Sequence, residues 1–238
     1  MKNCLGMILL ALLWAPGAFA RENQLQKATN VLNEIMAAPD RGIPRDMLDK
    51  AVCVGIVPSE IKGAFGVGGT YGRGVLDCRR HGNGPWGAPS MFTLGGGSFG
   101  LQIGGEATDV VFIVMNSAGA RKLIEDSVKL GGDVSVAAGP VGRTAEGATD
   151  AQLHAEILSY SRTRGLFAGV SLEGSVLKQD ADDNRDLYGR KLTAKQILIE
   201  GEVAAPPAAA PLRRALARYS PHGGHEMARL VNMQASLQ

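Results

Sequence analysis

The chain has 238 residues, of which 45% are hydrophobic and 5% are aromatic. This apolar share excludes a disordered chain, and the length is enough for one domain with a sizeable core. The 25 Lys and Arg residues nearly balance the 23 Asp and Glu residues, for a formal net charge of +2. Such a balance argues against bulk nucleic-acid binding, which needs many phosphate contacts, but it leaves room for a local basic patch.

The first twenty residues have the pattern of a secretory signal peptide. Lys2 supplies the positive charge, residues 5–14 form a short apolar run, and Ala18-Phe19-Ala20 is a small-x-small cleavage site. The apolar run is too short to span a bilayer as a helix. We therefore expect an exported protein of the bacterial periplasm or cell envelope whose mature chain begins at Arg21.

The first predicted element of the mature chain is an amphipathic helix. Apolar residues recur at three- and four-residue steps from Gln24 to Ala37, as they do on one face of a helix. Prolines end this pattern, and Pro44 suits the first turn of a short helix that runs to Lys50. Residues 51–57 form a continuous apolar run that ends at Pro58, which is typical of a buried strand.

A glycine-rich β region follows. The chain has 32 glycines, nearly twice the usual share of about 7%. Glycines among alternating apolar residues indicate bulges, tight turns and close backbone approach in a curved sheet. A turn at residues 81–85 divides the first two strands, and Ser117 can cap a short helix over residues 118–125. The segments expected to form strands are residues 63–76, 89–105, 109–115, 133–138, 152–161 and 166–177.

Two helices close the predicted domain, over residues 180–188 and 193–199, with Thr193 as the N-cap of the second. We therefore expect one α+β domain over residues 21–201, in which short helices cover a curved, mostly antiparallel, glycine-rich sheet or barrel. The Ala- and Pro-rich composition of the next residues is typical of a linker. Residues 202–238 are accordingly expected to form a linker and a weakly ordered basic tail.

Two cysteines follow the signal pattern, Cys53 and Cys78, and the sequence allows two states for them. A disulfide suits an oxidising compartment, whereas the apolar run around Cys53 equally suits a buried thiol. No metal site is predicted, because these cysteines and four separated histidines lack the spacing of zinc ligands. Polar residues alternate after Asp180 as in an EF-hand loop, but Arg185 and Lys191 stand where that loop needs Gly and Glu.

Two glycine motifs superficially match enzyme signatures. Residues 96–100 fit the G-x-S-x-G pattern of serine hydrolases, but the helix that this pattern requires is not indicated by residues 101–105, which alternate and are rich in glycine. Residues 66–72 look like a dinucleotide fingerprint, but the sequence continues as a strand rather than as a phosphate-binding helix. We therefore predict no catalytic residue, no cofactor and no enzymatic activity.

Several positive side chains stand beside glycine turns and strand ends. Guanidinium groups bind phosphate through a planar fork of donors, and backbone amides at glycine turns add to the grip. The alternative for each residue is a solvated strand end, and the sequence does not show which of them cluster in space. The candidates for binding lipid phosphate are Lys62, Arg73, Arg79, Arg80, Arg143, Arg162 and Arg164.

Six of these glycine-rich and strand segments together resemble the SYLF domain family, a lipid-binding module found alone in exported bacterial proteins and beside SH3 or FYVE domains in eukaryotes. The order and spacing agree over most of residues 24–200. The resemblance implies binding of phosphoinositides or other anionic lipids, without catalysis. The matching segments are residues 66–75, 88–92, 94–105, 108–111, 139–143 and 160–174.

In the SYLF family, membrane contact is attributed to an N-terminal amphipathic segment and to basic surface residues. The matching basic positions are Lys62 and Arg73, although Glu60 dilutes the charge beside Lys62. The matching helix is the one over residues 24–37. Its expected membrane-contacting side chains are Leu25, Val31, Leu32 and Ile35.

The leading hypothesis is therefore non-enzymatic binding of anionic lipid, with phospholipid or phosphoinositide-type headgroups, at a membrane surface of the cell envelope. For an exported bacterial protein the ligand would be phosphatidylglycerol, cardiolipin or another envelope anion. The alternative is a structural or protein-interaction domain of the envelope, without lipid specificity, whose basic C-terminal segment docks a protein partner.

Overall fold

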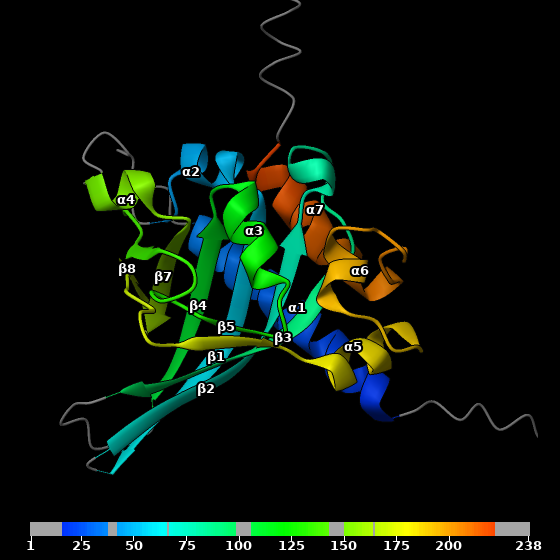
Figure 1. Ribbon diagram of the computed structural model, residues 1–238, viewed down its shortest axis with the longest axis horizontal. Coiled ribbons are helices and arrows are strands. Elements are labelled where there is room, and N and C mark those ends of the chain that lie inside the picture. The colour runs from blue at the N-terminus through cyan, green and yellow to red at the C-terminus, as the bar shows by residue number, and fades with distance from the viewer. Residues whose placement is uncertain are drawn as a thin grey trace, which may run out of the picture.

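The computed structural model describes residues 16–37, 42–65, 67–98, 106–142, 150–163 and 165–221. Its centre is a curled sheet with short helices on both faces, which confirms the predicted α+β class (Figure 1). The strands are β1 (Cys53–Phe65), β2 (Val67–Cys78), β3 (Ser90–Ser98), β4 (Glu106–Val114), β5 (Ser127–Lys129), β6 (Val136–Ala138), β7 (Ile157–Thr163), β8 (Leu166–Gly169) and β9 (Val176–Gln179). The helices are α1 (Pro16–Met36), α2 (Arg45–Lys50), α3 (Ser117–Leu123), α4 (Asp150–His154), α5 (Ala181–Tyr188), α6 (Ala194–Leu198) and α7 (Ala210–Tyr219), with 3-10 turns η1 (Arg80–Gly82) and η3 (Pro207–Ala209).

The sheet has the strand order β5-β9-β3-β2-β1-β4-β7-β6, and β8 also pairs with β7. All of the described pairings are antiparallel except that between β6 and β7. The longest strands, β1 and β2, stand at the centre of this order and extend past the body of the molecule at the lower left of Figure 1. The mostly antiparallel sheet was predicted, whereas the parallel pair was not; it joins two consecutive strands with α4 between them.

The first core lies between the sheet and helices α1, α2 and α7. Val54 and Ile56 on β1 face this layer, and Leu25 and Leu32 on α1 pack against it. In Figure 1, α1 runs behind the central strands. The apolar stripe predicted for residues 24–37 is therefore the buried face of α1, which fills the space over the sheet.

The second core lies on the opposite face of the sheet. Cys53 and Val57 alternate with the residues of the first core along β1 and join Leu123 of α3 and Leu198 of α6. A strand that is buried on both faces has apolar residues at every position rather than at alternate ones. That explains the continuous apolar run at residues 51–57.

Glycines on the central strands make room for aromatic rings. Gly55 pairs with Phe112 across β1 and β4, and Gly74 pairs with Phe92 across β2 and β3. A Cβ atom at Gly55 would lie 2.1 Å from Phe112 Cζ, and one at Gly74 would lie 2.4 Å from Phe92 Cζ. The two rings meet edge to face, with centroids 5.6 Å apart. The aromatic rings thus pack directly on the strand backbone, which is one physical reason for the high glycine content.

The buried strand predicted to end at Pro58 instead continues to Phe65. The register of β1 shifts on both sides of this point, between Ile56 and Ile61 against β2 and between Val57 and Glu60 against β4. Ser59 has a positive φ of 54°, and its amide donates to Asp109 Oδ1 at 2.9 Å. A bulge accommodates the proline without ending the strand, because bulged residues leave the regular hydrogen-bond ladder.

Of the two N-caps that the sequence predicts, Thr193 is confirmed and Ser117 is wrong. Thr193 forms a capping box with Gln196 at the start of α6, and the Asp180 side chain accepts from the Asp183 amide at the start of α5. This helix start takes the place of an EF-hand loop. The cap of α3 was wrong by one residue, because Asn116 rather than Ser117 accepts from the Gly119 amide.

Several predicted strands differ from the observed ones. Residues 63–76 span the end of β1 and most of β2, and residues 133–138 contain β6 only from Val136. Residues 152–161 divide into α4 and β7, with the strand beginning only at Ile157. Residues 166–177 divide into β8 and the start of β9, and Gly174, with a φ of 82°, lies in the turn between them. In these last two segments, apolar residues continue from one element into the next, so that the sequence pattern does not show the boundary between them.

The expected weak order after residue 202 is contradicted as far as residue 221. Pro207 begins η3, and α7 buries Leu212, Ala215 and Leu216 in the first core. Residues 222–238 lie outside the described part of the chain, as do residues 1–15 of the predicted signal peptide, whereas residues 16–20 begin α1. Within the described ranges, no helix combines the length and the apolar character needed to cross a membrane.

Candidate anion-binding surface

The connection between β2 and β3 carries the most deeply held arginine of the predicted set. Arg79 is 4% exposed, and its guanidinium donates to the carbonyl oxygens of Ala51 at 3.2 Å, Gly84 at 3.1 Å and Ser220 at 2.6 Å. It also lies 4.4 Å above the ring of Trp86. Burial lowers the pKa of Arg79, and the carboxyl groups of Asp49 and Asp77 oppose that shift. Arg79 therefore holds distant segments of the chain together and is not available to bind a ligand.

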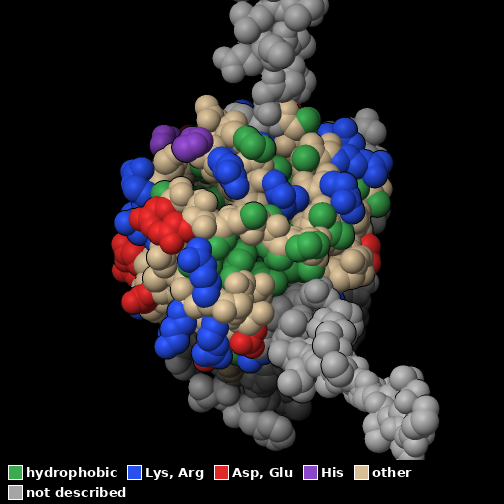
Figure 2. All heavy atoms as spheres, turned by 90° about the vertical axis from the view of Figure 1, so that its right-hand side faces the viewer, with side chains coloured by type: hydrophobic (Ala, Val, Ile, Leu, Met, Phe, Trp, Pro, Cys, Tyr) green, Lys and Arg blue, Asp and Glu red, His purple; other side chains and the backbone are tan. Residues whose placement is uncertain are grey.

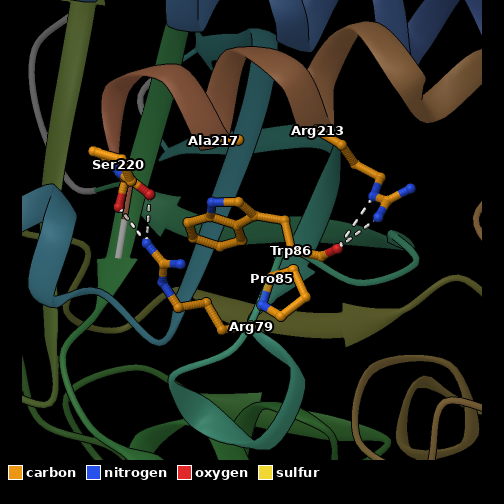
Figure 3. Close-up of a pocket in the computed structure, with 7 residues that line it drawn as sticks. Arg79, Pro85, Trp86, Arg213, Ala217 and Ser220 are labelled. Atoms are coloured by element: carbon orange, nitrogen blue, oxygen red, sulfur yellow. Dashed lines mark hydrogen bonds between the residues drawn. The ribbon is translucent and has the colours of Figure 1, made fainter. Parts of the chain in front are cut away.

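A second arginine reaches the same connection from α7. Arg213 donates from Nε and Nη2 to the carbonyl oxygen of Trp86, at 3.2 and 2.9 Å. Figure 3 shows the indole of Trp86 between the guanidinium groups of Arg79 and Arg213, beneath α7. The pocket at this junction has a volume of about 230 Å³ and is lined by Arg79, Pro85, Trp86, Arg213, Ala217, Ser220 and Pro221.

A buried carboxyl group lies close to these arginines. Asp77 Oδ1 accepts from the Gly87 amide at 3.1 Å, while Oδ2 has no hydrogen-bond partner among the described residues. Burial raises the pKa of Asp77 to about 8, and the positive charges of Arg213 and Arg79 only partly oppose this. Asp77 does not line the pocket, so the pocket surface itself carries positive charge without a carboxylate.

The arginines of α7 lie beside this junction and form what we call the α7 basic patch. Helix α7 has the sequence APLRRALARY, with three arginines and no acidic residue. Figure 2 shows Lys and Arg side chains gathered on the upper part of this side of the molecule, around exposed hydrophobic side chains. The patch consists of the exposed Arg214 and Arg218 together with the half-buried Arg213.

A second pocket of about 210 Å³ lies beside the same connection. Arg79 lines both pockets, and Cys53 and Cys78 lie at the base of the second. These cysteines are paired across β1 and β2 and form a disulfide with an S–S distance of 2.06 Å. Of the two states that the sequence left open, the structure has the bridge. The lining residues are Val52, Cys53, Cys78, Arg79, His81, Gly82, Ser117, Ala120, Arg121, Leu198 and Ile199.

The predicted phosphate-binding residues do not converge on one site. Arg162 on β7 pairs with Asp109, from Nη2 to Oδ2 at 2.6 Å, and with Glu34. Arg73 on β2 is half-exposed and lies 3.8 Å from Asp183. The side chain of Lys62, on β1, is not described, and Arg143 and Arg164 lie outside the described residues. Only Arg79 and Arg80 belong to the junction with α7.

The predicted membrane-contacting face of α1 is contradicted by its burial. Its four side chains cannot reach a bilayer in this fold, because the sheet and α7 cover them. The amphipathic pattern was correct, but it reports packing against the protein rather than against lipid. The side chains concerned are Leu25, Val31, Leu32 and Ile35, each at most 5% exposed.

The sequence analysis placed the arginines of α7 in a weakly ordered basic tail and missed the helix that orders them, although a signal for that helix is present. Leu212, Ala215, Leu216 and Tyr219 follow the three- and four-residue steps of a helix, and Pro211 suits its first turn. The preceding Ala/Pro-rich composition hid this pattern. The basic residues between the apolar ones are therefore part of an ordered helix.

Comparison with known proteins identifies relatives of the whole fold. Residues 95–219 match the Ysc84 family model, described as "Las17-binding protein actin regulator". An SH3 domain-containing protein of Schizosaccharomyces pombe is 44% identical over 177 residues, which cover 73% of this chain and 40% of that protein. LAS seventeen-binding protein 3 of Saccharomyces cerevisiae is 38% identical over 216 residues, covering 85% of this chain and 46% of that protein.

A vertebrate relative shows the same partial coverage. SH3 domain-containing YSC84-like protein 1 of Xenopus laevis is 33% identical over 205 residues, which cover 84% of this chain and 61% of that protein. The chain thus spans about half the length of these relatives. The name of the Saccharomyces cerevisiae relative describes a binding protein.

These relatives contradict the predicted location. They come from fission yeast, budding yeast and a vertebrate, and eukaryotic cells have no bacterial periplasm or envelope. The prediction of a secreted, periplasmic bacterial protein was therefore wrong. The error came from the apolar and small-residue pattern of the first twenty residues, which matches that of an export signal.

Proposed function

The chain belongs to the Ysc84 family, and on that premise we propose that it binds anionic phospholipid at a membrane surface without catalysing a reaction. Two independent features support this proposal. The resemblance to SYLF domains implies lipid binding, and the α7 basic patch offers a positive surface on an ordered helix. The names of the relatives, which describe binding and regulation, agree with a non-enzymatic role.

The α7 basic patch is the observation that carries the proposal. Arg214 and Arg218 are exposed, and no acidic residue of α7 neutralises them. Each Lys or Arg near an anionic membrane contributes about 1 kcal/mol, and salt weakens the attraction within a Debye length. A patch of this size predicts weak, reversible and salt-sensitive binding.

The mode of contact differs from the one that the sequence suggested. Because the apolar face of α1 is buried in the core, binding by insertion of that helix would require the core to open. Contact through arginine side chains requires no such change. We therefore expect electrostatic adsorption of the folded domain rather than insertion of an apolar helix.

The test is co-sedimentation of the full chain with vesicles of phosphatidylcholine alone or mixed with phosphatidylglycerol, at low and high salt. Binding should require the anionic lipid and weaken at high salt. The double variant Arg214→Glu/Arg218→Glu should lower affinity by a factor on the order of ten or more. The matched control is Lys129→Glu/Lys178→Glu, which makes the same charge change on the exposed strands β5 and β9. An equal loss of vesicle binding in both double variants would mean that binding depends on the net charge of the protein rather than on the α7 basic patch.

A second candidate function comes from the description of the family, "Las17-binding protein actin regulator", and from the name of LAS seventeen-binding protein 3. On this proposal the domain binds a protein of the actin-regulating machinery. The observation that favours it is the similarity of the whole domain to these proteins. Co-sedimentation of the full chain with actin filaments, without vesicles, tests it. Filament binding together with no binding to any vesicle would replace the lipid proposal.

A further inference from the structure

The second pocket combines a positive rim with an apolar wall. Its rim includes His81 from η1 and Arg121 from α3, and its hydroxyl group is that of Ser117. No Asp or Glu lines it. The apolar lining residues are Val52, Ala120, Leu198 and Ile199, of which Ile199 is 45% exposed.

The two basic side chains of the rim, Arg121 and His81, are available to a ligand. Within the described part of the chain, Arg121 and His81 make no side-chain hydrogen bond and no ion pair, and both are exposed. Neighbouring Lys122 shows the contrast, because its Nζ pairs with Glu156 Oε2 at 2.8 Å. Arg79 also lines the pocket, but its guanidinium donates to backbone carbonyl oxygens. It therefore contributes positive charge to the pocket rather than a direct hydrogen bond to a ligand.

His81 occupies this position at a conformational cost. Its φ of 56° and ψ of 23° lie in the left-handed region that side chains with a Cβ rarely adopt. Backbone hydrogen bonds hold the turn, from the Gly82 amide to Arg79 O at 3.1 Å and from the Gly84 amide to Arg80 O at 2.8 Å. Glycine would adopt the same turn without strain, so the turn alone does not account for a histidine at this position. Strain of this kind is typical of functional positions.

We propose that this pocket binds a phosphate monoester, either free or as the headgroup of a lipid. The planar donors of Arg121, with the imidazole of His81 and the hydroxyl of Ser117, approach from two elements and suit the several oxygens of a phosphate dianion. The organic part of the ligand packs against Leu198 and Ile199. The volume fits a compact headgroup and excludes an acyl chain.

This site is separate from the α7 basic patch, so the two proposals fail independently. The direct probes are phenyl phosphate and inorganic phosphate, titrated into the full chain and followed by backbone amide NMR and calorimetry. Phenyl phosphate should bind one to one, shift the amides of residues 81–82 and 117–121, and bind more tightly than inorganic phosphate because of the apolar wall. Arg121→Glu and Arg121→Gln should each lower its affinity at least tenfold, whereas Lys129→Glu leaves it unchanged.

A second variant separates binding from folding. His81→Gly removes the imidazole and relieves the strained backbone, so it should raise the thermal midpoint while lowering phenyl phosphate affinity several-fold. A residue with a purely structural role would not show these opposite effects. Unchanged affinity in both His81→Gly and Arg121→Gln would overturn the proposal, as would the absence of saturable binding of either probe.

The source of the phosphate is decided by vesicles that contain phosphatidic acid, a monoester, or phosphatidylglycerol, a diester. Loss of phosphatidic acid binding alone in Arg121→Gln identifies a lipid headgroup. Equal vesicle binding by the variant and the original chain, together with weakened phenyl phosphate binding, identifies a free phosphate monoester. Arg214→Glu/Arg218→Glu should leave phenyl phosphate binding intact, which distinguishes this site from the α7 basic patch.

Discussion

At the scale of single residues, several side chains that resembled ligand-binding groups instead hold the protein together. Arg79 satisfies carbonyl groups from three segments, and Arg162 pairs with Asp109 and Glu34. Hydrogen bonds offset the cost of burying such charges, and the same bonds leave few donors for a ligand. Arg80 and Arg121, which lack such partners among the described residues, are better placed to meet an anion.

Asp77 should make the stability of the fold depend on pH. Its pKa rises from an ordinary value of 3.8 to about 8 in the fold, because burial penalises the carboxylate. Between these values the folded chain retains a proton that the unfolded chain has lost. Stability should therefore fall as the pH rises from about 4 to about 8, by at most about 1.4 kcal/mol per pH unit. Urea unfolding across this range measures the slope.

The matched variant for this effect is Asp77→Asn. Its side-chain oxygen can still accept from the Gly87 amide, but the residue does not titrate. The slope between pH 4 and pH 8 should become much smaller in this variant. An unchanged slope would assign the pH dependence to other groups.

At the scale of elements, α7 is part of the core rather than an appendage. It packs against α1 and α2, and its apolar face completes the layer over the sheet. Removal of residues 204–238 would therefore expose apolar surface of α1, and it cannot serve as a neutral deletion. Point variants of exposed arginines are the cleaner test of binding.

Leu216→Ala tests this role of α7. Leu216 is fully buried, and truncation of such a leucine costs about 2–5 kcal/mol, depending on how far the cavity collapses. The control is Arg214→Ala on the exposed face, which should change the free energy of unfolding by no more than about 0.5 kcal/mol. Chemical denaturation measures both. A loss below about 1 kcal/mol for Leu216→Ala would mean that α7 is only loosely docked.

At the scale of the whole molecule, one curled sheet has a hydrophobic core on each of its two faces. The β2–β3 connection links these layers, because Arg79 contacts α7 on one side and lines the pocket beside α3 on the other. The disulfide joins β1 to β2 immediately before this connection. It therefore anchors the strand ends from which both candidate surfaces are built.

Loss of the disulfide should destabilise the entire domain. The cysteines are separated by 25 residues, and closing a loop of this size stabilises a fold by about 3 kcal/mol in the chain-entropy model. Cys53→Ser/Cys78→Ser should lower the free energy of unfolding by about that amount. A reducing agent should have a similar effect on the original chain and none on the variant. Equal stability of oxidised and reduced chains would contradict this expectation.

Local sequence patterns predict which segments form helices and which form strands. The helical steps at residues 24–37, the continuous apolar run at residues 51–57 and the capping pattern at Thr193 each predict local structure, because they depend on contacts between near neighbours along the chain. The resemblance to the SYLF family likewise rests on segments that keep their order and spacing. The α+β class and the antiparallel sheet followed from these features.

The contacts of each helix face and strand face, by contrast, follow from the tertiary structure. The same amphipathic pattern fits a helix on a membrane or in a core, and burial of Leu25 and Leu32 in the first core distinguishes the two. Arg79 and Ser220 meet across 141 positions, and no local pattern predicts such a contact. The candidate surfaces form from residues that the chain brings together only after the sheet has curled and α7 has packed against it. Their positions depend on long-range packing, which periodicity and spacing do not encode.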